Sequence, residues 1–379
     1  MDRQTSKTLN QRLLNKFLCQ ESEFADHEIK VPAKSFYDPM LFQKEKETFF
    51  LNAPQPIAFS AEISESNSFL SMEIMGTPIV LTRNQKGTLK AFLNACPHRG
   101  GKIACGTGQK KLLTCGFHGW SFTLDGDLAM RPQEACFTTD KSELGLIELP
   151  VNEESGIIIL GMAKNIDVSP AGAGYEAIAQ EISHYNLKTF KRIDRFDCEV
   201  AANWKLIVDL SLESYHFSVL HRESVATVLS SSSIFDTYER ASRWAFPWLT
   251  IERLAELEET DWPDALEGSC TYTLYPGVMV IVNASGAQMI RAEPGDNPNH
   301  TRISFVGLYH PDSNEADARQ GYEFGKKVFI EEDLKAAIEC QRGLESTQRD
   351  LIIGTNEPLL QFWHNLWQHD LHISSSIED

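Results

Sequence analysis

Two short loops constrain this 379-residue chain more than any other feature of its sequence. The first contains Cys96 and His98 in the pattern C-x-H, and the second contains Cys115 and His118 in the pattern C-x-x-H. Each loop therefore offers one thiolate and one imidazole, both of which bind transition metals. Glycines beside these residues let the backbone turn closely around a sulfur-bound centre. The two loops predict a metal centre held by two cysteines and two histidines.

Two kinds of metal centre use this set of ligands. A structural zinc site also takes two cysteines and two histidines, but zinc fingers usually pair like with like, with C-x-x-C before H-x-x-x-H. In a Rieske [2Fe–2S] cluster two cysteines hold one iron and two histidines hold the other. Because each loop here mixes the two residue types, the pattern favours the Rieske cluster, with Cys96, His98, Cys115 and His118 as its ligands.

The second loop also indicates which kind of Rieske centre this is. Between Cys115 and His118 stand Gly116 and Phe117. High-potential respiratory Rieske proteins carry a further cysteine in each loop and join the two in a disulfide, and the partner in the second loop is absent here. Cys105, near the first loop, therefore has no bridge to make. The loops instead resemble the cluster domain of Rieske non-haem iron oxygenases, and we expect a lower-potential centre.

A second constellation follows in the pattern E-x-x-H-x-x-x-x-H, formed by Glu213, His216 and His221. Two histidines and one carboxylate on one face of an iron leave open positions for O₂ and substrate. On an ideal helix the two histidines would point about 140° apart, so the helix should end or bulge between them if both bind one metal. Taken alone, the motif fits equally well an amphipathic helix whose histidines are surface or core residues.

With an N-W-K motif that begins at Asn203 and the Rieske loops upstream, this run resembles the catalytic domain of Rieske oxygenase α subunits, the terminal oxygenases of the aromatic-ring-hydroxylating dioxygenase family. The resemblance implies that His216 and His221 bind a mononuclear Fe(II). It also implies a third ligand, an Asp eight or nine residues before a Gln in a later helix. Asp333 fits this position, eight residues before Gln341. Three nearby carboxylates compete for the role: Glu331, Glu332 and Glu339.

Most members of the family have an Asp where this chain has Glu213. The resemblance implies a catalytic role for this residue, which bridges the Rieske histidine of a neighbouring subunit to an iron-ligating histidine and so carries the electron between the two centres. Glu keeps the carboxylate with one more methylene, so we expect the role to survive. Some relatives that oxidise quaternary ammonium compounds also have Glu here. Leu210 stands where an Asn is often found near the iron.

The periodicity of the chain predicts an α+β protein. Apolar residues at helical spacing indicate a helix near the N-terminus, within residues 9–18. Turn signals at 84–87 and 125–127 indicate β-hairpins on either side of the cysteine loops. The second half of the chain reads as strands at 271–275, 278–283 and 302–309 and as helices at 203–220 and 320–348.

The resemblance implies an all-β Rieske [2Fe–2S] domain followed by a helix-grip (START/Bet v 1-like) catalytic domain with an antiparallel sheet and helices. We expect three segments: an N-terminal helical segment, 1–45, that packs on the catalytic domain; the Rieske domain, 46–165; and the catalytic mononuclear-iron domain, 166–379. The resemblance also implies a homotrimer, or alternatively an α₃β₃ assembly.

Composition limits which partners we expect the protein to bind and in which compartment we expect to find it. The net charge of −18 argues against nucleic acid or an anionic membrane surface as a partner. Residues 1–20 lack the apolar core of a secretory signal, and eight scattered cysteines do not form a disulfide pattern, so we expect a cytoplasmic protein. The sequence contains neither G-x-G-x-x-G nor a Walker loop. NAD(P)H should therefore act only indirectly, through a separate reductase or ferredoxin.

The function expected from the resemblance is hydroxylation of an aromatic or other small organic substrate with O₂, by mono- or dioxygenation. One alternative is an N-demethylating or quaternary-ammonium monooxygenase of the same family, and another is a Rieske electron-transfer protein without oxygenase activity. A quaternary ammonium site would need aromatic rings or a carboxylate around the cation. Two groups of aromatic residues are candidates to line the pocket: Trp244, Phe246 and Trp248, and Phe362, Trp363 and Trp367.

Overall fold

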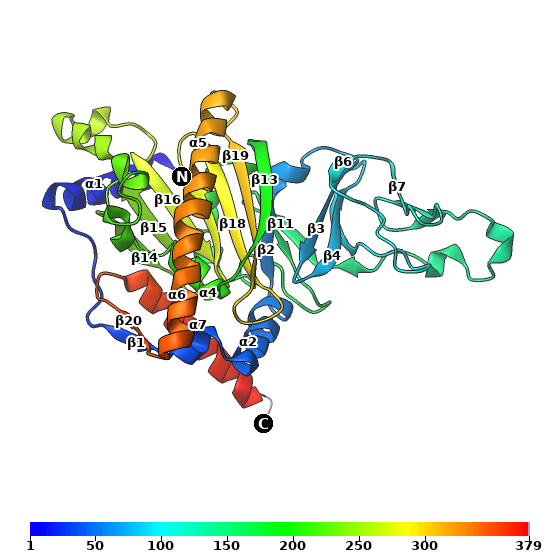
Figure 1. Ribbon diagram of the computed structural model, residues 1–379. Helices are drawn as coiled ribbons and strands as arrows, with labels where there is room; N and C mark the ends of the chain where they lie inside the picture. The colour runs from blue at the N-terminus through cyan, green and yellow to red at the C-terminus, as the bar shows by residue number, and fades with distance from the viewer. Residues whose placement is uncertain (378–379) are drawn as a thin grey trace. The chain divides into compact units, whose positions relative to one another are not determined.

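The computed structural model describes residues 1–377 and divides the chain into two compact units (Figure 1). One unit comprises residues 50–173, and the other joins residues 1–49 to the chain from Gly174 onward. From the sequence we expected these boundaries after residues 45 and 165. No helix within residues 1–377 combines the length and the apolar character needed to cross a bilayer.

The unit of residues 50–173 is built from antiparallel strands. They form three sheets, with strand orders β10-β5-β4-β3-β6, β11-β12-β2 and β7-β8-β9. The predicted hairpin between β4 and β5 is confirmed, and the side chain of Asn84 fixes its turn by accepting the N–H groups of Lys86 and Thr88. The strands are β2 (Gln55–Phe59), β3 (Ser68–Ile74), β4 (Thr77–Arg83), β5 (Leu89–Leu93), β6 (Thr107–Gln109), β7 (Leu112–Thr114), β8 (Ser121–Thr123), β9 (Leu128–Met130), β10 (Glu148–Leu149), β11 (Val151–Glu154) and β12 (Ile157–Leu160).

The other unit is a seven-stranded antiparallel sheet with helices, in the order β13-β19-β18-β17-β16-β15-β14. This confirms the predicted class, an all-β unit combined with an antiparallel sheet and helices. The sheet strands are β13 (Lys191–Val200), β14 (Ile234–Thr237), β15 (Ala241–Pro247), β16 (Gly268–Leu274), β17 (Val278–Val282), β18 (Gly286–Pro294) and β19 (Thr301–Tyr309), and a separate pair is formed by β1 (Ile29–Val31) and β20 (Leu351–Ile353).

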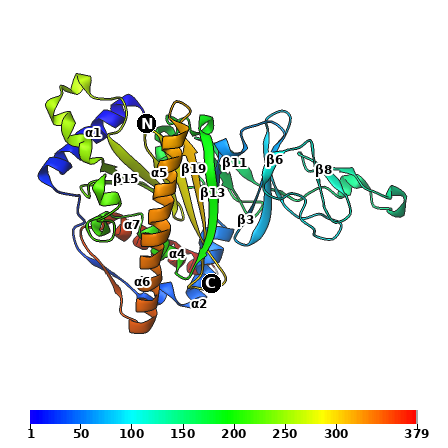
Figure 2. The same cartoon turned by 45° about the horizontal axis from the view of Figure 1, so that its top comes forward.

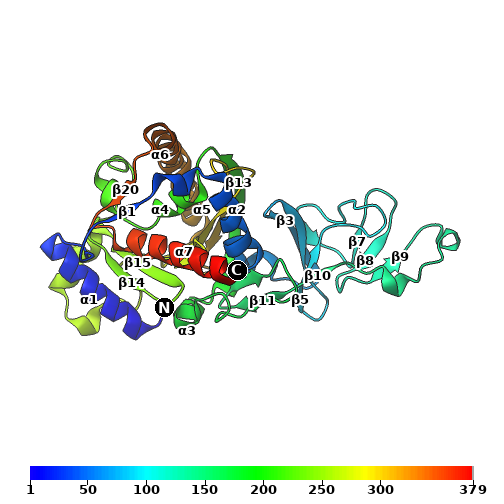
Figure 3. The same cartoon turned by 90° about the horizontal axis from the view of Figure 1, so that it is seen from below.

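Seven helices accompany the described part of this sheet unit, and the predicted N-terminal helix is among them. α1 and α7 both contact β14 (Figure 3). The helices are α1 (Arg3–Cys19), α2 (Pro39–Glu45), α3 (Glu176–Ser183), α4 (Trp204–Asp209), α5 (Glu315–Val328), α6 (Leu334–Thr347) and α7 (Pro358–Ile377).

α5 and α6 form one long rod that crosses a face of the sheet beside β18 and β19 (Figures 1 and 2). The predicted helix over 320–348 is therefore confirmed. Between α5 and α6 the backbone adopts a π-helical turn over Phe329–Asp333, which the sequence did not predict. Such π segments rotate the side chains that follow them and are frequent at functional sites. Asp333 is the last residue of this turn.

The expected helix over residues 203–220 is wrong beyond its first two turns. Asn203 caps α4 by accepting the N–H of Lys205 (3.0 Å), but α4 ends at Asp209. The chain then turns, because the buried hydroxyl of Ser214 donates to the carbonyl of Ser231 (2.8 Å) and holds this stretch against a distant loop. A short 3₁₀ turn over Tyr215–Ser218 follows.

Candidate metal centres

The two cysteine loops have the same backbone structure. In each loop the cysteine N–H donates to a carbonyl five residues later, of Gly101 (2.9 Å) for Cys96 and of Trp120 (2.8 Å) for Cys115. A glycine N–H then closes each loop on its cysteine carbonyl, with a φ of +74° at Gly100 and +73° at Gly119. Since L side chains rarely adopt such angles, glycine is required at both positions.

The loops bring their four predicted ligands together within the unit of residues 50–173. Both cysteines are buried, and the rings of His98 and His118 lie 4.6 Å apart. Burial raises the pKa of Cys96, while backbone N–H groups of His98 and Arg99 point at its sulfur and favour the thiolate. A Cβ at Gly101 would stand 3.2 Å from Sγ of Cys115, so the backbone forms a close cradle around the sulfur. This donor set fits a Rieske [2Fe–2S] cluster.

Cys96→Ser should abolish the Rieske EPR signal of the reduced protein and leave the iron of the catalytic unit in place. In the unmodified protein the average g of this signal should lie below that of all-cysteine clusters. Cys105→Ser is the matched control, because Cys105 is an exposed free thiol near the same loop. EPR spectroscopy with iron analysis measures both effects, and His118→Cys should convert the signal. A colourless protein that contains only zinc would contradict the cluster.

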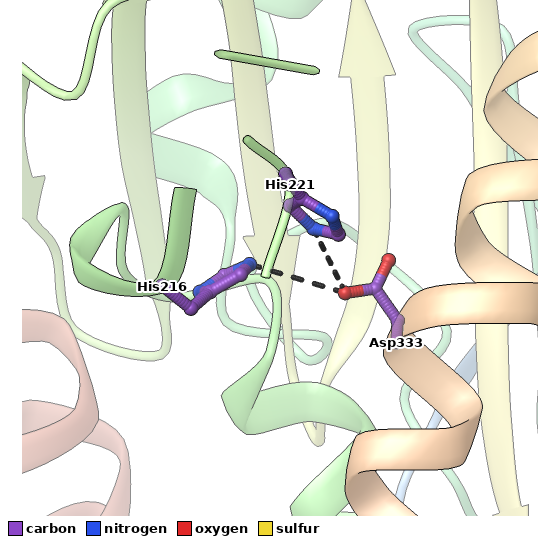
Figure 4. A group of neighbouring side chains, drawn as sticks. All are labelled: His216, His221 and Asp333. Atoms are coloured by element: carbon purple, nitrogen blue, oxygen red, sulfur yellow. Dashed lines mark ion pairs between the residues drawn. The ribbon is translucent and has the colours of Figure 1, made fainter. Parts of the chain in front are cut away.

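The second constellation is assembled from two distant segments of the chain (Figure 4). His216 and His221 come from the stretch after α4, and Asp333 comes from the end of the π turn. One donor atom from each of the three lies within 4.8 Å of the others. Oδ1 of Asp333 is 3.0 Å from Nε2 of His221 and 3.9 Å from Nε2 of His216. Figure 4 shows both imidazoles directed at this oxygen.

Both imidazoles are held from behind by carboxylates. Nδ1 of His216 is bonded to Glu213, and Nδ1 of His221 to Oε2 of Glu332 at 2.7 Å. Because each Nδ1 is occupied, each Nε2 is left for a metal, which is the usual arrangement of ligating histidines. Oδ1 of Asp333 is buried and accepts no hydrogen bond, as expected of an atom that binds a cation. Burial lowers the pKa of His221, but Asp333 and Glu332 outweigh it and raise that pKa.

The structure separates the carboxylates that compete with Asp333. Glu331 and Glu339 are exposed and lie outside the group of donors. Glu332 takes a different position, because its Oε2 accepts from Ser224 (2.7 Å) as well as contacting His221. It therefore orients an imidazole rather than facing the shared point. The sequence missed this role, although the need of every ligating histidine for an Nδ1 partner was a usable signal.

Gln341 joins the two halves of this site. Its side chain is buried, and its Oε1 accepts the N–H of Asn203 at 3.0 Å. Its amide also donates to the carbonyl of Phe36 (3.2 Å). Because Asn203 caps α4 and Gln341 lies on α6, this contact fixes the segment that carries the histidines relative to the helix that follows Asp333. The spacing between Asp333 and Gln341 thus has a structural reason.

Comparison with known proteins agrees with both centres. Residues 53–149 match the Rieske [2Fe-2S] domain, and residues 187–372 match the catalytic domain of the ring hydroxylating alpha subunit. The carnitine monooxygenase oxygenase subunit of Escherichia coli (strain K12) is 30% identical over 328 residues, which cover 83% of this chain and 84% of that protein. The chain belongs to the Rieske oxygenase α-subunit family.

Two further proteins are similar to this chain. The chloroplastic choline monooxygenase of Beta vulgaris is 30% identical over 226 residues, which are 58% of this chain and 49% of that protein. A crystal structure of a quaternary ammonium Rieske monooxygenase in complex with L-carnitine has a TM-score of 0.77 at 23% identity, and the match covers 90% of this chain and 95% of that one. This Rieske oxygenase is an enzyme whose cofactors are a [2Fe–2S] cluster and a mononuclear iron.

A cavity of about 360 Å³ opens beside the three candidate iron ligands of the oxygenase. Side chains of β15, β16, β18 and α5 line it. One part of its wall is a cluster of three rings, with centroid distances of 4.5 Å between Trp244 and Phe246 and 5.7 Å between Phe217 and Trp244. Phe217 is the neighbour of His216 in sequence, so this aromatic wall is continuous with the iron site.

The two predicted groups of aromatic residues have different positions. Trp244, Phe246 and Trp248 all line the cavity. Trp363 and Trp367 are instead buried away from it, and their N–H groups donate to the hydroxyl of Ser242 and the carbonyl of Pro276. Phe362 is likewise not among the residues that line the cavity. The second group therefore belongs to the core of the unit.

Proposed function

We propose that this Rieske oxygenase is a monooxygenase of quaternary ammonium substrates, which uses O₂ and electrons from a separate protein. The observation that carries the proposal is the aromatic wall formed by Phe217, Trp244 and Phe246 beside the candidate iron ligands. Ring faces of this kind attract quaternary ammonium groups. The relatives named above as carnitine and choline monooxygenases support the same class.

The charge of the cavity supports a cationic substrate. Among the described residues that line it there is no Lys or Arg, whereas two carboxylates, Asp317 and Asp333, face it. Because Asp333 is assigned to the iron, Asp317 is the carboxylate left for a substrate cation, which would also meet aromatic rings and no cationic side chain. A neutral aromatic substrate, as first expected from the sequence, would fill the same apolar space without using either feature.

The residues of the site have different roles in such a reaction. We assign His216, His221 and Asp333, which line the cavity, as the residues that would hold an iron there. When bound, the iron supplies the place at which O₂ is activated. Glu213 and Glu332 fix the two imidazoles, and the aromatic wall orients the substrate and excludes water.

The first test compares matched substrates that differ only in charge. With a surrogate reductase, choline should be oxidised more efficiently than 3,3-dimethylbutan-1-ol, its uncharged tert-butyl analogue. Trp244→Leu should weaken use of the cation by about 2- to 30-fold in kcat/KM, since a cation–π contact contributes roughly 0.5 to 2 kcal/mol. Product mass and incorporation of ¹⁸O from ¹⁸O₂ provide the measurement.

Either of two results would contradict the quaternary ammonium proposal. The neutral analogue could be hydroxylated as well as the cation, or Trp244→Leu could lower the two rates equally. Phe362→Leu is the matched control, because Phe362 is an aromatic residue outside the lining of the cavity. Aromatic-ring hydroxylation without a preference for charge would favour the function first expected from the sequence. Failure of all substrates with both iron centres present would favour the electron-transfer protein.

We further propose that electrons come from a separate reductase or ferredoxin and that the enzyme works as a homotrimer, with α₃β₃ as the alternative. Tyr215 and Val219, on either side of His216, are 70% and 81% exposed. Apolar side chains exposed beside a site support a subunit contact there. A cytoplasmic location is consistent with eight cysteines that form no disulfide among residues 1–377.

A further inference from the structure

Arg131 is a buried cation immediately after β9, in the same unit as the cysteine loops. Its side chain is only 2% exposed. Nη2 donates to Oε1 of Glu134 at 2.6 Å and Nε to Oε2 of the same carboxylate at 3.3 Å, while Nη1 donates to the carbonyl of Thr139 at 3.1 Å. The guanidinium is therefore fixed in one place. Half of the Glu134 side chain is exposed, so solvent screens its charge more than that of Arg131.

A stack of aromatic rings connects this cation to one side of the cluster site. The ring of His98 lies parallel to that of Trp120, with 4.9 Å between centroids and 5° between planes. Phe137 meets both rings edge-on, at 5.9 Å and 5.4 Å. Cζ of Arg131 is 5.6 Å from the centroid of Trp120 and 4.8 Å from that of Phe137. Trp120 and Phe137 thus each contact both the guanidinium and the ring of His98.

The second histidine has different surroundings. His118 is exposed, and its nearest ring is that of Phe117 at 3.9 Å, which is itself 58% exposed. The cation near that ring, Arg99, is also exposed. Only the His98 side of the site is therefore backed by a buried, fixed charge.

We propose that Arg131 is a positioning residue that clamps Trp120 and Phe137 against His98 and raises the reduction potential of the Rieske cluster. Reduction adds one negative charge to the cluster, and a fixed cation in a poorly solvated place stabilises that charge. Net charge and solvent exposure around a cluster are established determinants of its potential. The proposal concerns the electron-accepting step and is independent of which substrate is oxidised.

The test is a redox titration of the purified holoenzyme, followed by EPR of the reduced cluster. Arg131→Gln should make the potential more negative, with an equilibrium constant for reduction at least threefold lower, which is about 28 mV at 59 mV per tenfold for one electron. Arg131→Lys keeps the charge and should restore most of the potential. Arg83→Gln is the matched control, because Arg83 is a buried arginine of the same unit whose contacts are with Ile63, Gly87 and Glu153.

A second variant, for which the expected shift of the reduction potential has the opposite sign, keeps the proposal testable if Arg131→Gln does not fold. Glu134→Gln removes the half-exposed partner and leaves Arg131 uncompensated, so the potential should become more positive. If Arg131→Gln fails to assemble a cluster, Glu134→Gln decides alone, and an unchanged or lowered potential there overturns the proposal. An unchanged potential in a loaded Arg131→Gln protein, or an equal shift in Arg83→Gln, overturns it as well.

Discussion

Replacing Asp333 by Ala is expected to remove the mononuclear iron and abolish oxygenation while the Rieske EPR signal persists. The donors of His216, His221 and Asp333 lie within 4.8 Å of one another, and no fourth carboxylate faces the same point among the described residues. A site with three protein ligands has no spare donor, so loss of one should lower the iron content by about one per chain. The measurement is iron analysis of the purified protein, with product formation assayed in parallel.

Glu331→Ala is the matched control for this experiment. Glu331 lies two residues before Asp333 on the same helical rod, its side chain is 55% exposed, and it pairs only weakly with Lys327 at 4.0 Å. We expect this variant to keep both iron centres and to change stability by less than about 0.5 kcal/mol. Full iron content and activity in Asp333→Ala would instead move the third ligand to Glu332, the carboxylate that already contacts His221.

The Rieske loops were predictable because their structure is local. A cysteine, a histidine and a left-handed glycine lie within six residues in each loop, and each loop closes on its own backbone, at Gly101 and Trp120. Candidate ligands and the type of cluster can therefore be predicted from sequence alone. The packing around the loops could not be predicted in this way. The contact of Arg131 with Trp120 is an example, because no local sequence motif indicates it.

The candidate iron site was predictable only in its residue types. His216 and His221 stand out by spacing, yet the helix expected over residues 203–220 ends at Asp209. Ser214 is held by a distant carbonyl, and this tertiary contact outweighs helical propensity. His216 lies on a 3₁₀ turn and His221 in the turn that follows it, and the centroids of their rings are 4.8 Å apart. No periodicity of residue types in the sequence indicates the π turn that ends at Asp333.

The lining of the cavity could not be predicted from the sequence, because it depends on the register of the strands. Trp244 and Phe246 face the same side of β15 because side chains alternate along a strand. Their pairing with Thr271 and Ser269 of β16 fixes them beside the histidines. An isolated sequence cannot distinguish this pair from Trp363 and Trp367, which are equally apolar but belong to the core.

Glu213→Gln should keep both iron centres and still lose oxygenation by orders of magnitude. Glu213 binds Nδ1 of His216 and accepts its backbone N–H at 3.1 Å, so it lies behind the imidazole and outside the group of metal donors. If it also bridges to a cluster histidine of a neighbouring subunit, its negative charge serves the transfer of the electron, which an amide cannot replace. Glu213→Asp should keep part of the activity, because most relatives use the shorter carboxylate.

Glu332→Gln separates this bridging role from simple orientation of a histidine. Glu332 holds Nδ1 of His221 as Glu213 holds Nδ1 of His216, so both substitutions disturb one imidazole in the same way. Loss of such a partner typically costs about 10- to 100-fold in metal affinity or activity, and this is the effect we expect for Glu332→Gln. Prereduced enzyme mixed with O₂ and substrate in a single turnover reports the difference. Cluster oxidation should be slowed far more in Glu213→Gln than in Glu332→Gln, and equal rates in the two variants would leave Glu213 only the task of orienting His216.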